Sequence, residues 1–228
     1  MTAPGVGGGH EWHGGKMLSF CKKAEEVFDT AHSLIGQKIN KVEYYGLRII
    51  SEEIDSDYNV ISQEFSNYKT KYNNIHSFEI ALSIYMESGD IYDIIWDNIF
   101  YCYGLRIIKN DHEEYENVAV KKWIMTEDSI WKKCINNEIT NICILWETNY
   151  ESYEILPNGE KRKVENKNEE NWNPITCLIN FREPRNKRNS IIVSTSGFIG
   201  KNEEMLFKGH DNILVTDNYE TAVYIGII

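Results

Sequence analysis

The sequence contains no run of eighteen apolar residues, and its first thirty positions lack a basic region followed by an apolar stretch. A membrane-spanning helix and a secretory signal are therefore not expected. Asparagine is abundant, yet no Asn-x-Ser/Thr acceptor for glycosylation occurs. These absences favour a soluble protein of the cytoplasm.

Cysteine is scarce, and its positions are unsuited to cross-linking. The five cysteines include no close pair, whereas zinc cages and disulfide frameworks use closely spaced or paired cysteines. We therefore expect reduced, buried thiols and neither a metal site nor a cofactor. The five residues are Cys21, Cys102, Cys134, Cys143 and Cys177.

Positive charge is outnumbered by negative charge. Lys and Arg total 24 against 35 Asp and Glu, which gives a net charge of −11. Residues 1–116 contain 19 acidic and 10 basic side chains, whereas residues 117–228 contain 16 and 14, so most of the excess lies in the first half. A field of this sign repels phosphate backbones and anionic lipid headgroups, so nucleic acids and membranes are not expected partners.

Fragments that imitate functional motifs each lack a required residue. The stretch DSDYN, residues 55–59, opens like a calcium loop, yet Val60 stands where that loop needs glycine and Ser66 where it needs glutamate. No nucleophile elbow is present, and His32, His76 and His210 are isolated from one another. The sequence therefore assigns no catalytic residue and no metal ligand.

Two helices are predicted. Residues 1–16 are rich in glycine and show no periodicity, which indicates a flexible leader or a tag. From Leu18 to Ile35 apolar residues recur at three- and four-residue spacing, which predicts an amphipathic helix that ends at Gly36. A second amphipathic helix is predicted over Trp123–Ile135, with Thr126 as its cap.

Most of the remaining chain has the composition of β-strands. HSFEIALSIYME alternates apolar and polar residues, and the turn ESGD leads into IYDIIW, so these segments predict a hairpin. VEYYGLRII and FYCYGLRII predict two more strands, and their shared spelling is either coincidence or one strand pattern used twice. In the second case Gly46 and Gly104 mark bulges or close approaches, and Arg48 and Arg106 pair with neighbouring carboxylates.

A larger repeat relates the two halves of the chain. A shift of one hundred residues lays the apolar pattern of residues 35–44 on residues 135–144, and a shift of ninety-seven lays residues 78–84 on residues 175–181. We therefore predict an α+β, β-rich fold of two related antiparallel-sheet units, each with an N-terminal helix. The expected division is a leader at 1–16, an acidic unit at 17–116 and a related unit at 117–228.

Aromatic residues interleave with the acidic residues of the first unit. Tyr and Trp supply much of the energy of protein interfaces, and a field of one sign attracts a partner of the opposite sign. This pattern predicts a surface that binds a basic protein, and the alternative is a solvated surface that keeps the chain soluble. The predicted contact residues are Glu52, Glu53, Asp55, Asp57, Tyr58, Asp90, Tyr92, Asp93, Trp96, Asp97, Tyr101 and Tyr103.

LIGQKINKVEYY, HSFEIALSIYMESGDIYDIIWDNIFYCYGL and DNILVTDNYETAVYIGI together resemble small duplicated β-rich bacterial proteins, similar to immunity proteins of polymorphic toxin systems. The resemblance covers residues 32–228 and rests on apolar pattern and turn placement. It implies a cytoplasmic, non-enzymatic inhibitor of one cognate toxin. We hypothesise that the toxin is basic, for example a nuclease whose phosphate site meets these carboxylates. Two alternatives stay open: a hydrolase or small-ligand-binding protein with a cleft between the units, and an assembly protein.

Overall fold

The computed structural model describes residues 15–65, 67–97, 104–110, 120–148, 152–155, 161–164, 172–182, 189–199 and 205–228. These residues form fourteen strands and two helices. The elements are α1 (Gly15–Ser33), β1 (Ile39–Leu47), β2 (Ile49–Ile54), β3 (Val60–Phe65), β4 (Ile75–Phe78), β5 (Ala81–Met86), β6 (Ile91–Asp97), β7 (Gly104–Asn110), β8 (Val120–Ile124), β9 (Ile139–Thr148), β10 (Ser152–Ile155), β11 (Lys161–Val164), β12 (Trp172–Phe181), β13 (Ser190–Ile199), β14 (Met205–Thr216) and α2 (Tyr219–Tyr224).

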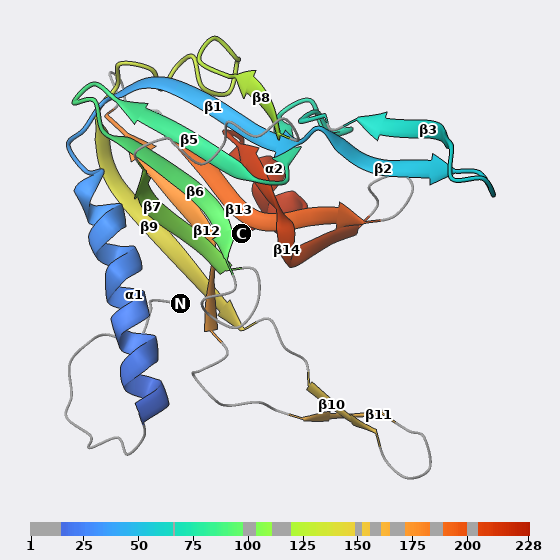
Figure 1. The fold of residues 1–228 in the computed structure, drawn as a ribbon. Coiled ribbons are helices and arrows are strands. Elements are labelled where there is room, and N and C mark those ends of the chain that lie inside the picture. Colours follow the sequence, from blue (N-terminus) through green and yellow to red (C-terminus); the bar gives the residue numbers. More distant parts are fainter. Residues whose placement is uncertain are drawn as a thin grey trace.

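Two five-stranded antiparallel sheets pack face to face (Figure 1). The first sheet has the strand order β7-β6-β5-β1-β8, and the second has the order β4-β14-β13-β12-β9. Every strand pair in them is antiparallel. The expected β-rich fold with antiparallel sheets and a small helical content is confirmed.

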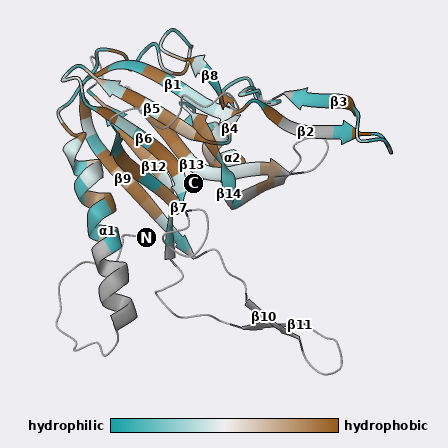
Figure 2. Cartoon of the chain, in the orientation of Figure 1, coloured by the Kyte–Doolittle hydropathy of each residue, from teal (hydrophilic) through white to brown (hydrophobic). Residues whose placement is uncertain are grey.

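The main core lies between the sheets. Strand side chains alternate between the two faces of a sheet, so Val42 and Tyr44 of β1 point inward, toward the same core that holds Cys177 and Ile179 of β12. Figure 2 shows hydrophobic residues concentrated along the strands of the two sheets. Because one core contains side chains from both halves of the chain, the halves stabilise each other.

Helix α1 runs beside β7 at one side of the sandwich (Figure 1). The predicted helix is present, and Val27, Ala31 and Leu34, spaced by four and three residues, are buried in the main core. The chain then turns at Gly36, whose φ of +86° lies in the left-handed region that glycine adopts at no steric cost. No helix in the described ranges is both long and apolar enough to cross a membrane.

The prediction of a helix over Trp123–Ile135 is wrong. Trp123 belongs to strand β8, and residues 126–134 form a series of turns instead. Thr126 does not cap a helix, because its hydroxyl accepts a hydrogen bond from the backbone N–H of Val42 at 3.2 Å. Ile130, Trp131 and Cys134 are nevertheless buried, so their helix-like spacing reflects burial of an irregular turn.

The segment HSFEIALSIYME is divided between the two sheets. Its first part, β4, pairs with β14 of the second sheet, while its second part, β5, pairs with β1 and forms the predicted hairpin with β6. Strand β8 pairs with β1 although it follows residue 117. The expected boundary between residues 116 and 117 therefore does not separate the two sheets.

A smaller apolar cluster lies on the outer face of the second sheet, beneath α2. Ala222 of α2 and Ile227 near the C-terminus pack with Ile192 and Leu214 of the sheet. Asn218 caps α2 by accepting a hydrogen bond from the backbone N–H of Thr221 at 2.9 Å. The second sheet is thus covered on both faces.

Two further hairpins stand apart from the sheets. Strands β2 and β3 pair only with each other, as do β10 and β11, and Figure 1 shows both hairpins extending from the body of the molecule. The first interrupts the connection from β1 to β5, and the second interrupts that from β9 to β12.

Candidate functional site

The hairpin β2–β3, residues 49–65, carries the first group of predicted contact residues, and we refer to it as the arm. Its register pairs Glu52 with Gln63 and Glu53 with Ser62, with a bulge between Glu53 and Ile54. A strand rises about 3.3 Å per residue, so the six-residue strands of the arm are roughly 20 Å long. An isolated two-stranded hairpin has little stability of its own in water.

Asp55 builds the tip of the arm. One carboxylate oxygen accepts hydrogen bonds from the backbone N–H groups of Asp57 and Asn59, each at 2.8 Å, and the other accepts from the Asn59 amide at 3.0 Å. These bonds from Asn59 and Asp57 lower the pKa of the Asp55 carboxyl. Asp55 therefore shapes the tip, and its carboxylate is already engaged within the arm.

Tyr58, at this tip, has a strained backbone conformation, and its side chain points into solvent. Its φ of +64° lies in the left-handed region, which costs an L-residue about 1–2 kcal/mol. It is 83% exposed, so packing of its side chain within the chain does little to offset that cost. Asp57 is likewise exposed beside it.

The outer half of the arm is also apolar. Among the described residues ten large hydrophobic side chains are exposed, and four of them lie between residues 54 and 61. Apolar groups gathered at one exposed place typically mark an interaction site. The four are Ile54, Tyr58, Val60 and Ile61.

The charge of the arm has a single sign. Glu52, Glu53, Asp55, Asp57 and Glu64 lie in it, and no Lys or Arg occurs between Arg48 and Lys69. Glu53 is exposed and accepts a hydrogen bond from the Ser62 hydroxyl at 3.1 Å. The arm thus combines exposed apolar groups with unrelieved negative charge.

The second group of predicted contact residues lies in and beside β6, within the first sheet, and two of its members are buried. Asp93 is fully buried and accepts hydrogen bonds from the Ser83 hydroxyl at 2.5 Å and from the Asn110 amide. Tyr92 is also buried, and its hydroxyl accepts from Ser33 and Gln37 at 3.2 Å each. Neither side chain is available to a partner protein in this conformation.

The other members of this group have partners within the chain. Asp90 forms an ion pair with Lys109 at 2.8 Å, and Asp97 forms one with Arg106 at 2.9 Å, as expected for that arginine. The indole N–H of Trp96 donates to the backbone oxygen of Glu79 at 2.6 Å. Tyr101 and Tyr103 lie outside the described residues. Those of the predicted residues that the structure describes therefore do not form one continuous face, and the arm is the part that projects.

Sequence reasoning missed a buried ionic cluster around Glu43 of β1. Burial alone would raise its pKa, but Lys41, 2.8 Å away, and the hydroxyls of Tyr85 and Tyr45 outweigh burial and hold the pKa at about 2. The alternation Lys41-x-Glu43-x-Tyr45, which places all three on one face of a strand, was the available signal. One carboxylate oxygen accepts from the two tyrosine hydroxyls and the other is paired with Lys41, so the cluster is suited to stability.

His76 of β4, which the sequence left isolated, joins a buried hydrogen-bonded chain with Tyr44 and Trp131. Its Nε2 atom lies 3.9 Å from the Asp128 carboxylate. A Tyr-His-Asp series of this kind can relay a proton in an enzyme. Here Tyr44 is fully buried and His76 is 6% exposed, so the series offers no open position for a substrate.

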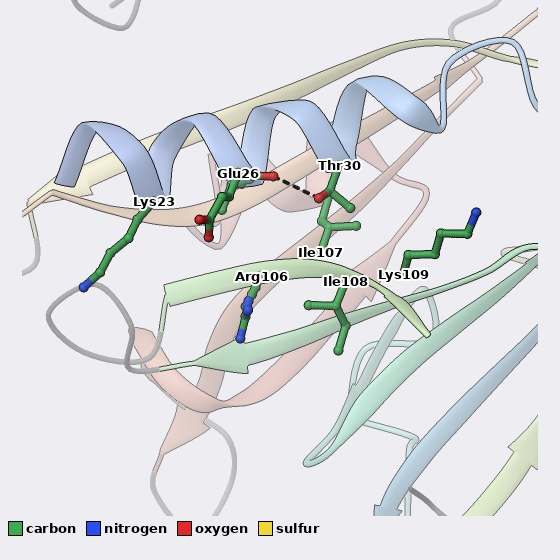
Figure 3. A pocket seen from close by; sticks show the side chains of 8 residues that line it. Lys23, Glu26, Thr30, Arg106, Ile107, Ile108 and Lys109 are labelled. Carbon is green, nitrogen blue, oxygen red and sulfur yellow. Dashed lines mark hydrogen bonds between the residues drawn. The ribbon is translucent and has the colours of Figure 1, made fainter. Parts of the chain in front are cut away.

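A groove of about 300 Å³ lies between α1 and β7 (Figure 3). Lys23, Arg106 and Lys109 line it together with Glu26. The ammonium group of Lys109 points away from the charged ends of Lys23 and Arg106 in Figure 3, and Arg106 and Lys109 are paired with the carboxylates named above. Cations that diverge and are neutralised do not form an anion site.

The space expected as a cleft between two units is occupied by the main core in the part of the chain that the structure describes. Within the same residues, no group of three His, Cys, Asp or Glu side chains is placed to hold a metal ion. Among the sites described, the arm combines exposed apolar side chains with acidic residues and contains no Lys or Arg.

Comparison of the chain with protein-family models, with curated proteins and with solved structures finds no match, so its function must be inferred from these residues themselves.

Proposed function

We propose that the chain is a non-enzymatic, immunity-type inhibitor that binds and neutralises a basic toxin through the arm. The observation that carries this proposal is the joint presence, on one projecting hairpin, of four exposed large hydrophobic side chains and five acidic residues without a cation. Apolar groups supply affinity when they are buried at an interface, while charge of one sign speeds capture of a partner of opposite sign.

The dimensions of the arm favour insertion into a concave site. It is two strands wide and roughly 20 Å long, so it fits a cleft better than a flat surface. A nuclease is the partner class that we favour, because a cleft that binds phosphates is lined by cations that carboxylates can pair with. Occupation of such a cleft would block its activity, and the inhibitor would act in the cytoplasm.

Capture of partners from lysate of the source cell, with elution by a salt gradient, tests the proposal. We expect one basic protein that leaves the chain only at raised salt, because screening weakens attraction between exposed charges. The variant Glu52→Lys, Glu53→Lys, Asp57→Lys should weaken its binding at least tenfold at low salt. The matched control Glu25→Lys, Glu127→Lys, Glu220→Lys makes the same change of charge at exposed positions outside the arm and should leave binding nearly unchanged.

Equal loss in the two variants would mean that only net charge matters and would contradict a role for the arm. Asp93 is excluded from such tests because it is buried and hydrogen-bonded, so its replacement would perturb the sheet. A hydrolase or small-ligand-binding protein is the alternative, and it would show turnover or saturable binding that the arm variant does not change.

We also propose that the two sheets derive from copies of one ancestral unit. In support, β1-β5-β6-β7 and β9-β12-β13-β14 are both four-stranded antiparallel meanders, each with a hairpin inserted after its first strand. The pair Leu82 and Ile94 and the pair Ile179 and Ile191 are both directly opposed, and the ninety-seven-residue shift relates them. Superposition of the two meanders at that shift tests the proposal, and a better fit at another shift would contradict it.

A further inference from the structure

The tip of the arm holds one bulky side chain where a small residue is the usual choice. A left-handed conformation is readily adopted by glycine, and among other residues asparagine and aspartate tolerate it best. Here Tyr58 adopts it, although Asp57 and Asn59 stand on either side. The backbone N–H of Tyr58 donates a hydrogen bond to the backbone carbonyl oxygen of Asp55 at 3.1 Å, which fixes Tyr58 in the turn.

Nothing in the described part of the chain explains this choice by packing. The Tyr58 side chain is exposed almost as fully as that of Tyr224, which lies at the end of α2. Residues that the surrounding structure holds in a strained backbone conformation are concentrated at functional sites. The strain therefore directs attention to a contact that Tyr58 makes outside the chain.

The surroundings of Tyr58 have the anatomy of an interface centre. Ile54, Val60 and Ile61 are exposed next to the tip, and the acidic side chains of Glu53 and Asp57 flank them. Binding energy in protein interfaces is concentrated in a few aromatic or arginine residues at the centre, surrounded by a polar rim. Tyrosine suits that centre because it presents a large rigid surface with few rotatable bonds.

We infer that Tyr58 is the anchor of the arm, a preset aromatic side chain that enters a pocket on a basic protein whose rim places Lys or Arg against Asp57 and Glu53. This inference rests on the proposed function and names the residue on which it depends. A second copy of the chain is a poor occupant, because two arms carry the same negative charge and repel each other.

The test uses the full chain and, as probe, the basic protein that the unaltered chain captures and salt releases, purified by itself. Tyr58→Asn should keep the tip folded, because asparagine tolerates the left-handed region, while the dissociation constant should rise at least 30-fold, the size of loss seen at anchor residues. Tyr58→Phe should stay within about threefold of the unaltered chain, since it keeps the ring. Tyr224→Asn, the matched control, should leave affinity unchanged.

Hydrogen exchange of the amides of Asp57 and Asn59 supplies the readout that a merely structural role would not produce. We expect the protection of these amides in Tyr58→Asn to be equal to or greater than in the unaltered chain. Affinity would then fall although the tip stays folded. Loss of protection together with affinity would show that Tyr58 only shapes the turn and would overturn the inference.

The remaining outcomes separate this inference from the proposed function. Equal affinity of Tyr58→Asn and the unaltered chain would overturn the anchor while the inhibitor proposal stands. Capture of no basic protein by the unaltered chain would overturn both. Self-association in sedimentation experiments that Tyr58→Asn abolishes would assign the arm to a second copy and overturn the partner class named here.

Discussion

The hydroxyl oxygen of Tyr44 lies 3.2 Å from Nδ1 of His76, so a hydrogen bond joins these two buried side chains. The same oxygen accepts a hydrogen bond from the indole N–H of Trp131 at 2.6 Å. The other ring nitrogen of His76, Nε2, lies on the side of Asp128.

Stability should fall as the solution is made mildly acidic. Burial lowers the pKa of His76 despite the opposing effect of Asp128 and Asp217, and Lys69 lowers it further. The unfolded state, with an imidazole pKa near 6.5, then binds more protons than the folded state, so stability is lost as the pH falls below 6.5 toward the lower folded value. Urea unfolding between pH 7.5 and 5.5 measures this loss.

His76→Gln is the matched variant for that experiment, because its side-chain amide can still form a hydrogen bond with the Tyr44 hydroxyl but does not titrate. We expect the dependence on pH in this window to become shallower in the variant. An unchanged dependence would assign the loss of stability to other groups.

Glu43→Gln should lower the free energy of unfolding by about 2 kcal/mol. The substitution removes the buried negative charge that pairs with Lys41 and accepts hydrogen bonds from two tyrosine hydroxyls. Because the partly exposed lysine is then hydrated by water, the loss of stability is smaller than for breaking a fully buried ion pair. Glu53→Gln, at an exposed position, should change stability by less than about 0.5 kcal/mol. Chemical denaturation at pH 7 compares them.

The contribution of Glu43 to stability should also depend on pH in the acidic range. Because its folded pKa is about 2 and its ordinary value is 4.5, the stability that ionised Glu43 contributes is present above pH 4.5 and is lost as the pH falls toward 2. The difference in stability between the unaltered chain and Glu43→Gln should therefore shrink over that range. A constant difference would contradict the low pKa.

Gly46→Ala should destabilise the chain by about 1–3 kcal/mol, because an added Cβ would lie 2.8 Å from two ring carbons of Trp123 and force repacking. Gly36→Ala is the comparison: no atom lies within 4 Å of its added Cβ, and its cost of about 1 kcal/mol comes from the positive φ alone. Thermal unfolding distinguishes them, and a larger loss at Gly36 would contradict the steric account.

Thiol reactivity should depend on burial. Cys143 is exposed on β9, whereas burial raises the pKa of Cys134 and Cys177 to about 12 and withholds their thiolates. Cys143→Ser should remove one fast-reacting thiol from the count obtained with a disulfide reagent in the folded chain. Cys177→Ser should remove none until denaturant is added.

Local pattern predicted those parts of the fold in which neighbouring residues decide the structure. The spacing of apolar residues from Leu18 to Ile35 and the position of Gly36 were sufficient to predict α1, although the face that packs on the core is that of Val27, Ala31 and Leu34. The close approach expected of Gly46 is present. The same reasoning wrongly predicted a helix over residues 126–134. There, contacts with β1, such as the hydrogen bond between Thr126 and Val42, replace the backbone hydrogen bonds of a helix.

The candidate site was predictable only in part, for a similar reason. Asp57 and Asp93 belong to acidic stretches that look alike in sequence, yet one lies at the tip of a free hairpin and the other in the middle of a sheet. Whether a strand pairs on one side or on two depends on residues far away in the chain. Burial of Asp93 was therefore not readable from its neighbours, and the strain at Tyr58 was invisible without backbone angles.

The pairing of β4 with β14 has a consequence for synthesis of the chain. Phe78 of β4 lies opposite Ile213, so β4 must wait until β14 has been synthesised before it finds its partner. Contacts this distant in sequence slow folding and leave apolar strands exposed in the meantime. All strands of the first sheet leave the ribosome before β14 does, so that sheet is free to form first. The second sheet stays incomplete, and the nascent chain most open to aggregation, until β14 has emerged.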